Sequence, residues 1–299
     1  MTTKSALKLF RVESGKKFQL SDHDPGSTHG FEASEDAQDE LKRGVAVLAD
    51  MQEKLYAQSR WAVLLIFQAM DAAGKDGVIR HVMSGVNPQG CQVYSFKGPS
   101  TEELAHDFLW RTNKCLPERG RIGIFNRSYY EETLVVRVHP ELLDKQMIPR
   151  QLVTKKIWEQ RFEDINNLES YLTRNGVVVR KFFLNISKEE QKQRFLRRLE
   201  DPDRNWKFSE ADARERSHWD EYMAAYDDMI RNTATPEAPW YIVPADHKWF
   251  TWLVVAGAII DTLEGLDLQY PKVDEAKKKE LEAARRLLEK EPKAKKRGR

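Results

Sequence analysis

A segment containing glycine and lysine, QAMDAAGKDG at residues 68–77, has the residue types of a phosphate-binding loop. The ordinary P-loop reads G-x-x-x-x-G-K-S/T, in which the lysine contacts phosphates and the final hydroxyl binds magnesium. In this chain Ala69 replaces the first glycine and Asp76 replaces the hydroxyl residue. The segment is therefore a damaged nucleotide site, a chance match, or a loop built for a different phosphate donor.

Within this segment an acidic and a basic side chain lie four positions apart. Asp71 follows a strongly apolar run, so it falls at the carboxyl edge of a predicted strand, where ligands of open α/β folds bind. It either caps the following helix or holds Mg²⁺, directly or through water. Lys75 supplies a mobile charge for phosphate oxygens. The neighbouring residues offer backbone N–H groups at a helix N-terminus; they are Ala72, Ala73, Gly74, Asp76 and Gly77.

A second polar cluster, IFNRSYYEE at residues 124–132, ends another predicted strand. Asn126, Arg127 and Ser128 fall in its turn, at the same carboxyl edge as the phosphate-like loop. The planar donor fork of arginine suits phosphate oxygens, and arginine charge on a transferring phosphoryl group is a large catalytic contribution. The alternative is an arginine that is simply solvated at an ordinary helix start.

Further basic residues fall near this edge or in the segments that follow it. The sequence LEDPDRNWKFSEAD at residues 199–212 combines helix-breaking Pro202 with basic residues and an aromatic one, which is typical of a mobile lid over a nucleotide. Taken singly, each basic residue is most simply a solvated surface charge. Together they predict a groove for a ligand with several phosphates; they are Arg80, Lys97, Arg137, Arg194, Arg197, Arg198, Arg204 and Lys207.

The elements that must position these residues alternate between apolar runs and amphipathic segments. The run WAVLLIF at residues 61–67 lacks polar alternation, which is typical of a strand buried on both faces of a parallel sheet. Strands are predicted at residues 61–67, 91–98, 121–128, 176–187 and 238–246, and the intervening helices at 32–60, 75–86, from 99 onward, 129–138, 150–174, 188–201 and 249–266. This alternation predicts a five-stranded parallel sheet with helices on both faces.

The two ends of the chain differ in composition from the rest. Residues 1–32 mix Gly, Asp, His and Ser and predict an extended arm, and residues 33–270 form the predicted catalytic domain. Residues 271–299 are rich in Lys, Glu and Ala, which indicates a solvated helix with a basic end or, alternatively, a nucleic-acid-binding arm.

Bulk properties exclude several classes of protein. The 299 residues carry a net charge of +2, so no global field points to nucleic acid. Cys91 and Cys115 have no metal-binding spacing and are typical of a reducing compartment. The sequence has no signal-peptide pattern and no apolar run long enough to span a membrane, so we expect a cytoplasmic protein with no membrane partner.

Three motifs, DAAGKDG, NRSYYEE and DPDRNWKFS, together resemble the polyphosphate kinase 2 family over residues 40–266. The resemblance implies a P-loop kinase-like three-layer sandwich with a helical lid at about 201–220. It implies phosphoryl transfer between inorganic polyphosphate and nucleotides with Mg²⁺, or Mn²⁺ in its place. In this family the loop reads D-x-x-G-K followed by Gly or Asp, so the missing hydroxyl is the norm.

Carried over residue by residue, the resemblance makes Asp71 the metal-linked acid, Lys75 the phosphate-binding lysine and Arg127 the arginine of the second motif. Arg204 and Lys207 become the basic residues of the lid. Many members read D-R-S-W-Y-N-R in the second motif, where this chain has an asparagine first and Glu131 sixth.

Asn126 cannot supply the negative charge that an aspartate offers a metal, and Glu131 is the candidate to compensate. This combination resembles the subgroup that accepts both AMP and ADP. The implied partners are polyphosphate and adenine nucleotides, with guanine nucleotides left open and no nucleic acid, in a homodimer or homotetramer.

Two other functions are compatible with the residues. An ATP-dependent nucleotide kinase of the thymidylate-kinase type would share the sheet and lid. An anion- or nucleic-acid-binding protein would use the arginine cluster and the tail, but it would leave Asp71 unexplained.

Overall fold

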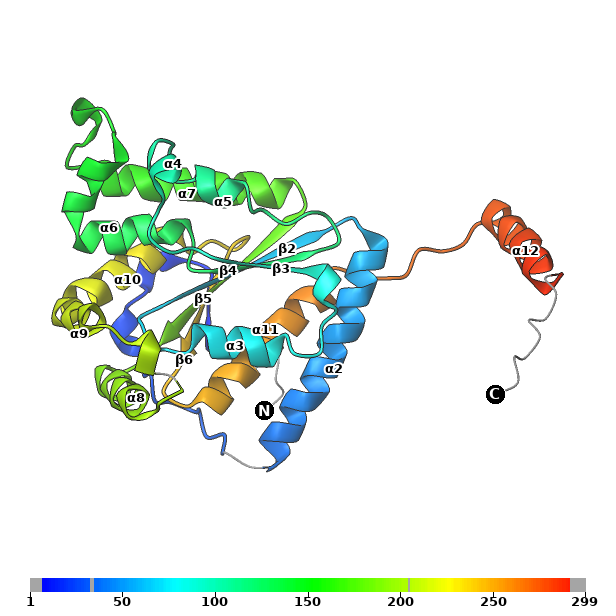
Figure 1. Cartoon of the computed structure of the whole chain (residues 1–299), viewed down its shortest axis with the longest axis horizontal. Helices are drawn as coiled ribbons and strands as arrows, with labels where there is room; N and C mark the ends of the chain where they lie inside the picture. The colour runs from blue at the N-terminus through cyan, green and yellow to red at the C-terminus, as the bar shows by residue number, and fades with distance from the viewer. Residues whose placement is uncertain (1–6, 33–34, 204, 291–299) are drawn as a thin grey trace.

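The computed structural model describes residues 7–32, 35–203 and 205–290. Its centre is a six-stranded sheet with the order β1-β6-β5-β2-β4-β3 (Figure 1). The strands are β1 (Arg11–Val12), β2 (Ala62–Ala69), β3 (Cys91–Ser95), β4 (Ile122–Asn126), β5 (Val177–Asn185) and β6 (Trp240–Pro244). Strands β2 to β6 are mutually parallel where they pair, as the alternating pattern predicts.

The prediction of five strands was wrong by one, because the N-terminal arm adds β1 to the edge of the sheet. Arg11 and Val12 pair antiparallel with Tyr241 and Trp240 of β6, so the sheet is mixed. A two-residue strand has no detectable alternation, and sequence periodicity could not reveal it. The arm is held there by buried apolar side chains scattered along it, at Leu7, Phe10, Phe18 and Leu20.

Helices cover both faces of the sheet and make three layers. The α-helices are α2 (Glu35–Gln58), α3 (Lys75–Val82), α4 (Thr101–Leu104), α5 (Trp110–Asn113), α6 (Val135–Val138), α7 (Ile157–Arg174), α8 (Lys188–Glu200), α9 (Glu210–Glu215), α10 (Trp219–Thr233), α11 (Lys248–Glu264) and α12 (Glu275–Glu289). Short 3-10 helices are η1 (Gly15–Lys17), η2 (Leu20–Asp22), η3 (Pro88–Gly90), η4 (Tyr129–Thr133), η5 (Pro140–Gln146), η6 (Arg150–Leu152), η7 (Asn205–Lys207) and η8 (Arg216–His218).

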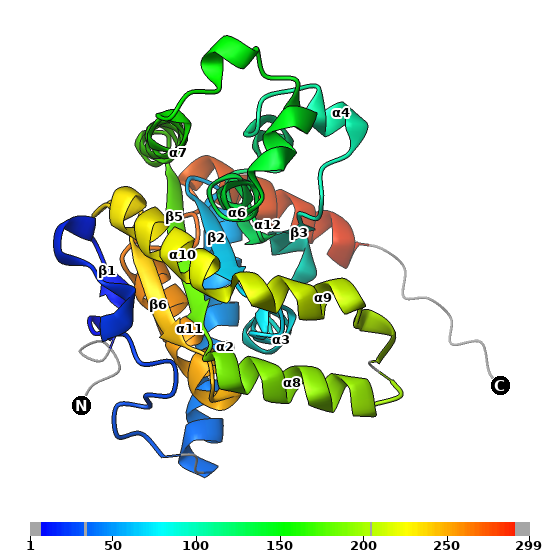
Figure 2. The same ribbon diagram turned by 90° about the vertical axis from the view of Figure 1, so that its left-hand side faces the viewer.

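The layers follow from where the apolar residues lie. All eight residues of β2 are buried, as expected for a central strand covered on both faces. Helices α2, α3 and α11 cover one face, and α6, α7 and α10 cover the other (Figure 1). Figure 2 shows α8 and α9 beside α3, near the carboxyl ends of the strands.

Two predicted helices are shorter than their patterns indicate. The predicted helix at 129–138 is the 3-10 helix η4 followed by α6, because Leu134 between them has non-helical dihedral angles of φ −115° and ψ −83°. The predicted helix at 150–174 begins only at Ile157. Residues 150–156 are all exposed, so no apolar face stabilises a helix there.

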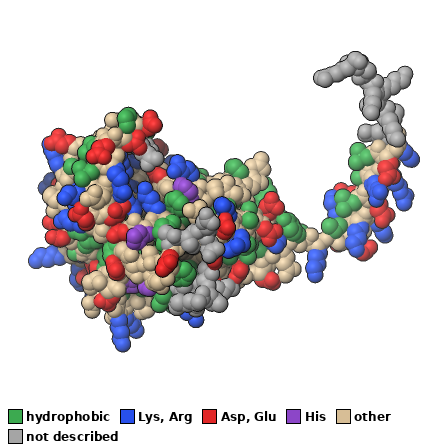
Figure 3. Space-filling view, turned by 90° about the horizontal axis from the view of Figure 1, so that it is seen from below, with side chains coloured by type: hydrophobic (Ala, Val, Ile, Leu, Met, Phe, Trp, Pro, Cys, Tyr) green, Lys and Arg blue, Asp and Glu red, His purple; other side chains and the backbone are tan. Residues whose placement is uncertain are grey.

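The tail helix α12 stands apart from the body of the molecule. All of its residues are exposed, and Figure 3 shows charged side chains over its surface with hydrophobic ones between them. The basic end at 291–299 lies outside the described residues. Among the residues that the structure describes, none of the helices is both long and apolar enough to cross a bilayer.

Candidate active site

The phosphate-like loop connects β2 to α3 at the carboxyl edge of the sheet, where the sequence placed it. Gly74 has a φ of +109°, which side chains rarely tolerate, and an added Cβ there would lie 3.6 Å from Arg194 Nη1. Ala72 also has a positive φ, of +61°. The loop therefore turns sharply so that α3, which begins at Lys75, presents its N-terminus to the edge.

Lys75 is buried at the base of this loop. Its ammonium donates to the main-chain oxygens of Ala69 (2.7 Å) and Met70 (3.3 Å). Burial lowers the pKa of Lys75 from 10.5 to about 8, and the carboxylate of Asp71 opposes that shift. The amine is thus charged at neutral pH and held where the strand ends.

Arg194, which the sequence assigned to a phosphate-binding groove, lies behind the loop and supports its backbone. The side chain is 6% exposed. Its Nη1 donates to the oxygens of Ala72 (3.1 Å) and Ala73 (2.8 Å), and its Nη2 to those of Ala245 (2.6 Å) and Asp246 (3.0 Å). Nε donates to Glu190 Oε1 at 2.8 Å. In this conformation every donor group of Arg194 is engaged, so the residue ties the loop to the segment after β6 rather than facing a ligand.

Arg127 joins the two polar motifs. Its backbone has a φ of +63°, and its Nη2 donates to Asp71 Oδ1 at 2.9 Å. Nη1 lies 3.4 Å from Glu131 Oε2, and Glu131 Oε1 accepts from Gln68 Nε2 at 2.8 Å. The Glu131 carboxylate, followed by that of Asp71, raises the pKa of Arg127 against the opposing effect of burial.

Asp76, which replaces the hydroxyl residue of the ordinary P-loop, contacts Asn126, which replaces the aspartate common in the second motif. Asn126 Nδ2 donates to Asp76 Oδ1 at 2.7 Å. An aspartate at the first position would place two carboxylates together, which is unfavourable without a cation between them. The asparagine thus matches the aspartate that replaces the usual P-loop hydroxyl, and the pair links the start of α3 to the end of β4.

A cavity of about 180 Å³ opens beside Asp71, Arg127 and Glu131. The lid and α10 supply much of its wall, mixing charged groups with apolar ones. Sequence reasoning assigned none of these wall residues to the site. Ala69, Met70 and Asp212 lie in the segments singled out above, and the others belong to no motif and are mostly remote in the chain. These wall residues are Gln191, Asp212, Glu215, Arg216, Tyr222 and Tyr226, together with Ala69, Met70, Leu134 and Val135.

Several predicted basic residues lie outside this cavity. Arg80 and Lys97 are exposed, and Arg137 pairs with Asp228 at 2.5 Å. Arg204 and the side chain of Lys207 lie outside the described residues. Their part in phosphate binding stays a prediction.

Within the described ranges, no group of three or more His, Cys, Asp or Glu side chains is placed to hold a metal ion. Mg²⁺ commonly binds proteins through one or two carboxylates and completes its shell with water and substrate phosphates. The carboxylate of Asp71, 38% exposed and facing the cavity, fits that mode of binding.

A largely parallel sheet with helices on both faces, a glycine–lysine loop at a helix N-terminus and a lid define the class of P-loop kinase-like phosphotransferases. The model of the family described as polyphosphate kinase 2 matches residues 31–271. The chain belongs to the polyphosphate kinase 2 family.

Relatives in this family match almost the whole chain. An ADP-polyphosphate phosphotransferase from Rhodopseudomonas palustris is 52% identical over 282 residues, which is 94% of this chain and 98% of the relative. An AMP/ADP-polyphosphate phosphotransferase from Meiothermus ruber is 43% identical and covers 91% and 98%. The crystal structure of polyphosphate kinase 2 from Arthrobacter aurescens is 41% identical and superposes with a TM-score of 0.84 over 93% of this chain and 96% of that one. These likenesses support the predicted fold class.

Proposed function

We propose that this protein transfers phosphoryl groups reversibly between inorganic polyphosphate and AMP or ADP, yielding ADP or ATP. The observation that carries the proposal is the convergence of Asp71, Lys75 and Arg127 on one corner of the sheet. The near full-length match to relatives named for polyphosphate transfer supports it and does not favour an ATP-dependent nucleotide kinase. The Asn126 and Glu131 pattern supports acceptance of both nucleotides.

The chemistry requires positioning and charge neutralisation more than a base. A terminal phosphate oxygen of the nucleotide is already anionic, and it attacks the end phosphorus of polyphosphate in line with the departing oxygen. Lys75, released from the oxygens of Ala69 and Met70, neutralises charge on the phosphates. Arg127 stabilises the charge that develops on the transferred group.

We further propose Mg²⁺ as the cofactor, with Mn²⁺ as its substitute, held by Asp71 directly or through water. Bound there, the cation supplies charge neutralisation of phosphate oxygens. Asp71 also orients the Arg127 guanidinium, because the two are already paired at 2.9 Å. Titrating MgCl₂ and MnCl₂ into the Asp71→Asn variant tests this role, since that variant should need far more metal than the wild type if it turns over at all.

The remaining proposals concern partners and setting. We propose a homo-oligomer, a cytoplasmic location and guanine nucleotides as secondary acceptors. Light scattering during size-exclusion chromatography tests the first, cell fractionation the second, and assays with GMP and GDP the third.

The decisive experiment incubates purified protein with polyphosphate, MgCl₂ and either AMP or ADP, and separates the products by chromatography. ATP formed from ADP without any other donor supports the function, and ADP formed from AMP supports the broader acceptor range. Lys75→Ala and Asp71→Asn should abolish turnover while the protein stays folded. Lys42→Ala, on an exposed lysine of α2, is the matched control and should be fully active. Near-normal activity of Lys75→Ala would refute the assignment.

A further inference from the structure

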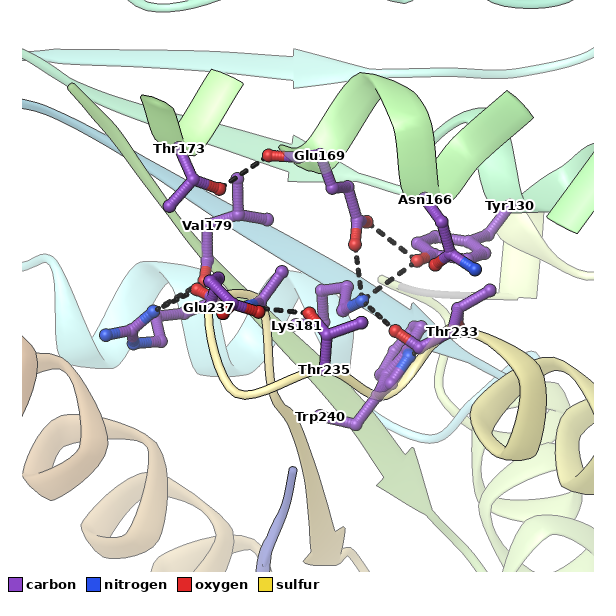
Figure 4. A network of polar contacts seen from close by, with 12 residues as sticks. Tyr130, Asn166, Glu169, Thr173, Val179, Lys181, Thr233, Thr235, Glu237 and Trp240 are labelled. Atoms are coloured by element: carbon purple, nitrogen blue, oxygen red, sulfur yellow. Dashed lines mark hydrogen bonds and ion pairs between the residues drawn. The ribbon is translucent and has the colours of Figure 1, made fainter. Parts of the chain in front are cut away.

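A fully buried ion pair lies under the sheet face that α7 and α10 cover (Figure 4). Lys181 of β5 is 0% exposed and Glu169 of α7 is 2% exposed. Lys181 Nζ lies 2.5 Å from Glu169 Oε2 and also donates to Tyr130 Oη (3.1 Å) and to the main-chain oxygen of Thr233 (2.7 Å). Glu169 Oε1 accepts from the hydroxyls of Tyr129 (2.9 Å) and Tyr130 (2.7 Å).

Every strong donor of this network has a partner. The three N–H bonds of the ammonium meet three acceptors, and the carboxylate accepts from the ammonium and both hydroxyls. Burial, with the Glu169 carboxylate adding to it, raises the pKa of Tyr129 and of Tyr130 well above the ordinary value, so both hydroxyls stay protonated and donate. Burial lowers the pKa of Lys181, and Glu169 counteracts that shift.

A buried ion pair is an expensive way to fill a core. Removing two charges from water costs more than packing apolar side chains of similar volume, so such a pair rarely adds net stability. The residues that pair with Lys181 on the adjoining strands, Ile66 and Trp240, are both buried and apolar. The pair instead fixes geometry, because the Glu169 carboxylate accepts hydrogen bonds from two tyrosine hydroxyls and so determines where they lie.

The two tyrosines occupy a particular place in the chain. They follow Arg127 and Ser128 directly and precede Glu131, whose carboxylate contacts the Arg127 guanidinium. The turn that connects β4 to these tyrosines is strained at Arg127, where the backbone φ is +63°. Within it, Ser128 Oγ accepts a hydrogen bond from the amide of Tyr130 at 3.2 Å. A turn of this kind persists only when its surroundings determine it strongly.

We infer that Lys181 and Glu169 are positioning residues for the reaction: by anchoring Tyr129 and Tyr130 they hold the strained turn that aims Arg127. Neither charged residue lines the cavity, so each acts through the turn rather than by touching the substrate. The inference rests on the proposed phosphoryl transfer, because it concerns the arginine that serves that reaction.

The test replaces the ion pair by an apolar pair, Lys181→Met/Glu169→Leu, which leaves no buried charge without a partner. The variant leaves the buried hydroxyls of Tyr129 and Tyr130 without their acceptor, so it should unfold at a lower temperature than the wild type while staying folded in the assay. Its kcat for ADP phosphorylation should fall about 10- to 100-fold, as expected for a misplaced catalytic group. KM should change little, because Arg127 acts on charge that develops in the transition state.

A mutant cycle separates positioning from general loosening. If the pair acts through Arg127, adding the apolar pair to Arg127→Ala should lower the residual kcat by less than about twofold. An equal loss in both backgrounds would overturn the inference, as would an apolar-pair variant with wild-type kcat. Should the apolar pair fail to fold, Tyr129→Phe/Tyr130→Phe removes only the two hydroxyl ties, and wild-type kcat in that variant would also overturn it.

The control is Arg180→Met, on the same strand with its side chain bonded to Thr262 Oγ1 (3.1 Å) and to the oxygen of Glu237 (3.1 Å). It should lower stability without lowering kcat. Wild-type turnover in the same assay tests the proposed function separately. A crystal structure of the apolar-pair variant needs no turnover, and it should show the Arg127 guanidinium displaced from Asp71.

Discussion

Raising the pH from 7 to 10 should deprotonate Lys75 and thereby lower kcat/KM for polyphosphate. Burial lowers the pKa of this ammonium to about 8 in the free protein. A neutral amine cannot neutralise phosphate charge, so kcat/KM for polyphosphate should fall about tenfold for each pH unit above roughly 8. Bound phosphates favour the charged form of Lys75, so kcat itself should fall only at higher pH.

The lowered pKa of Lys75 should also make the free energy of unfolding depend on pH. Since the folded pKa is about 8 and the ordinary value is 10.5, the unfolded chain binds more protons between those values, and stability must rise with pH across that window. The penalty for burying charged Lys75 is complete below pH 8 and amounts to about 3 kcal/mol, at 1.36 kcal/mol per pKa unit. The difference in unfolding free energy between wild type and Lys75→Met should shift by that amount from pH 7 to 10.5, as measured by urea denaturation.

The pH dependence of kcat/KM is measured as ATP formation from ADP at fixed ionic strength and saturating MgCl₂. Few other groups interfere: the phosphates of nucleotides lose their last proton near pH 6, and burial raises the pKa of Tyr222 and Tyr226 in the cavity wall. Lys75→Arg keeps a permanent charge and is the control, since its kcat/KM should lose the alkaline decline whatever its absolute rate. A wild-type kcat/KM that stays flat to pH 10 would refute the reasoning.

Three more predictions follow from the contacts. Asn126→Asp places a carboxylate against Asp76, so without metal the variant should unfold at a lower temperature than the wild type. MgCl₂ should restore most of the lost unfolding temperature, and an equal loss with and without metal would count against a cation between the two carboxylates. Glu169→Gln leaves the Lys181 ammonium buried without its counter-charge, so the free energy of unfolding measured by urea denaturation should fall by about 3–5 kcal/mol. The control Glu163→Gln, at an exposed position on the same helix, should change that free energy by less than about 0.5 kcal/mol. The KM for polyphosphate should rise steeply with NaCl, because many weak phosphate contacts are screened together, and a salt-independent KM would contradict binding along a charged chain.

Much of the site was predictable from strand order alone. The apolar run before Asp71 and the run before Asn126 both read as buried parallel strands, and the carboxyl ends of parallel strands share one edge. Asp71, Lys75 and Arg127 therefore had to meet once β2 and β4 became neighbours.

Other features depend on which distant segments come to surround a side chain. Arg194 belongs to a run of arginines that looks like a solvated helix face, yet it alone is buried against main-chain oxygens of Ala72, Ala73, Ala245 and Asp246. Local periodicity contains no information about where those oxygens lie.

By itself, the amino-acid sequence determined the alternation of strands and helices and the groups available for phosphate chemistry, because both depend on residue type and short-range spacing. The tertiary structure decided which charges are buried, and therefore what each charge does. Lys75 at the start of α3 and Lys181 in β5 are both buried lysines, and only their surroundings distinguish an ammonium held by main-chain oxygens from one half of an internal ion pair. Desolvation and pairing arise from contacts between segments far apart in the chain, so these two properties form only when the fold does.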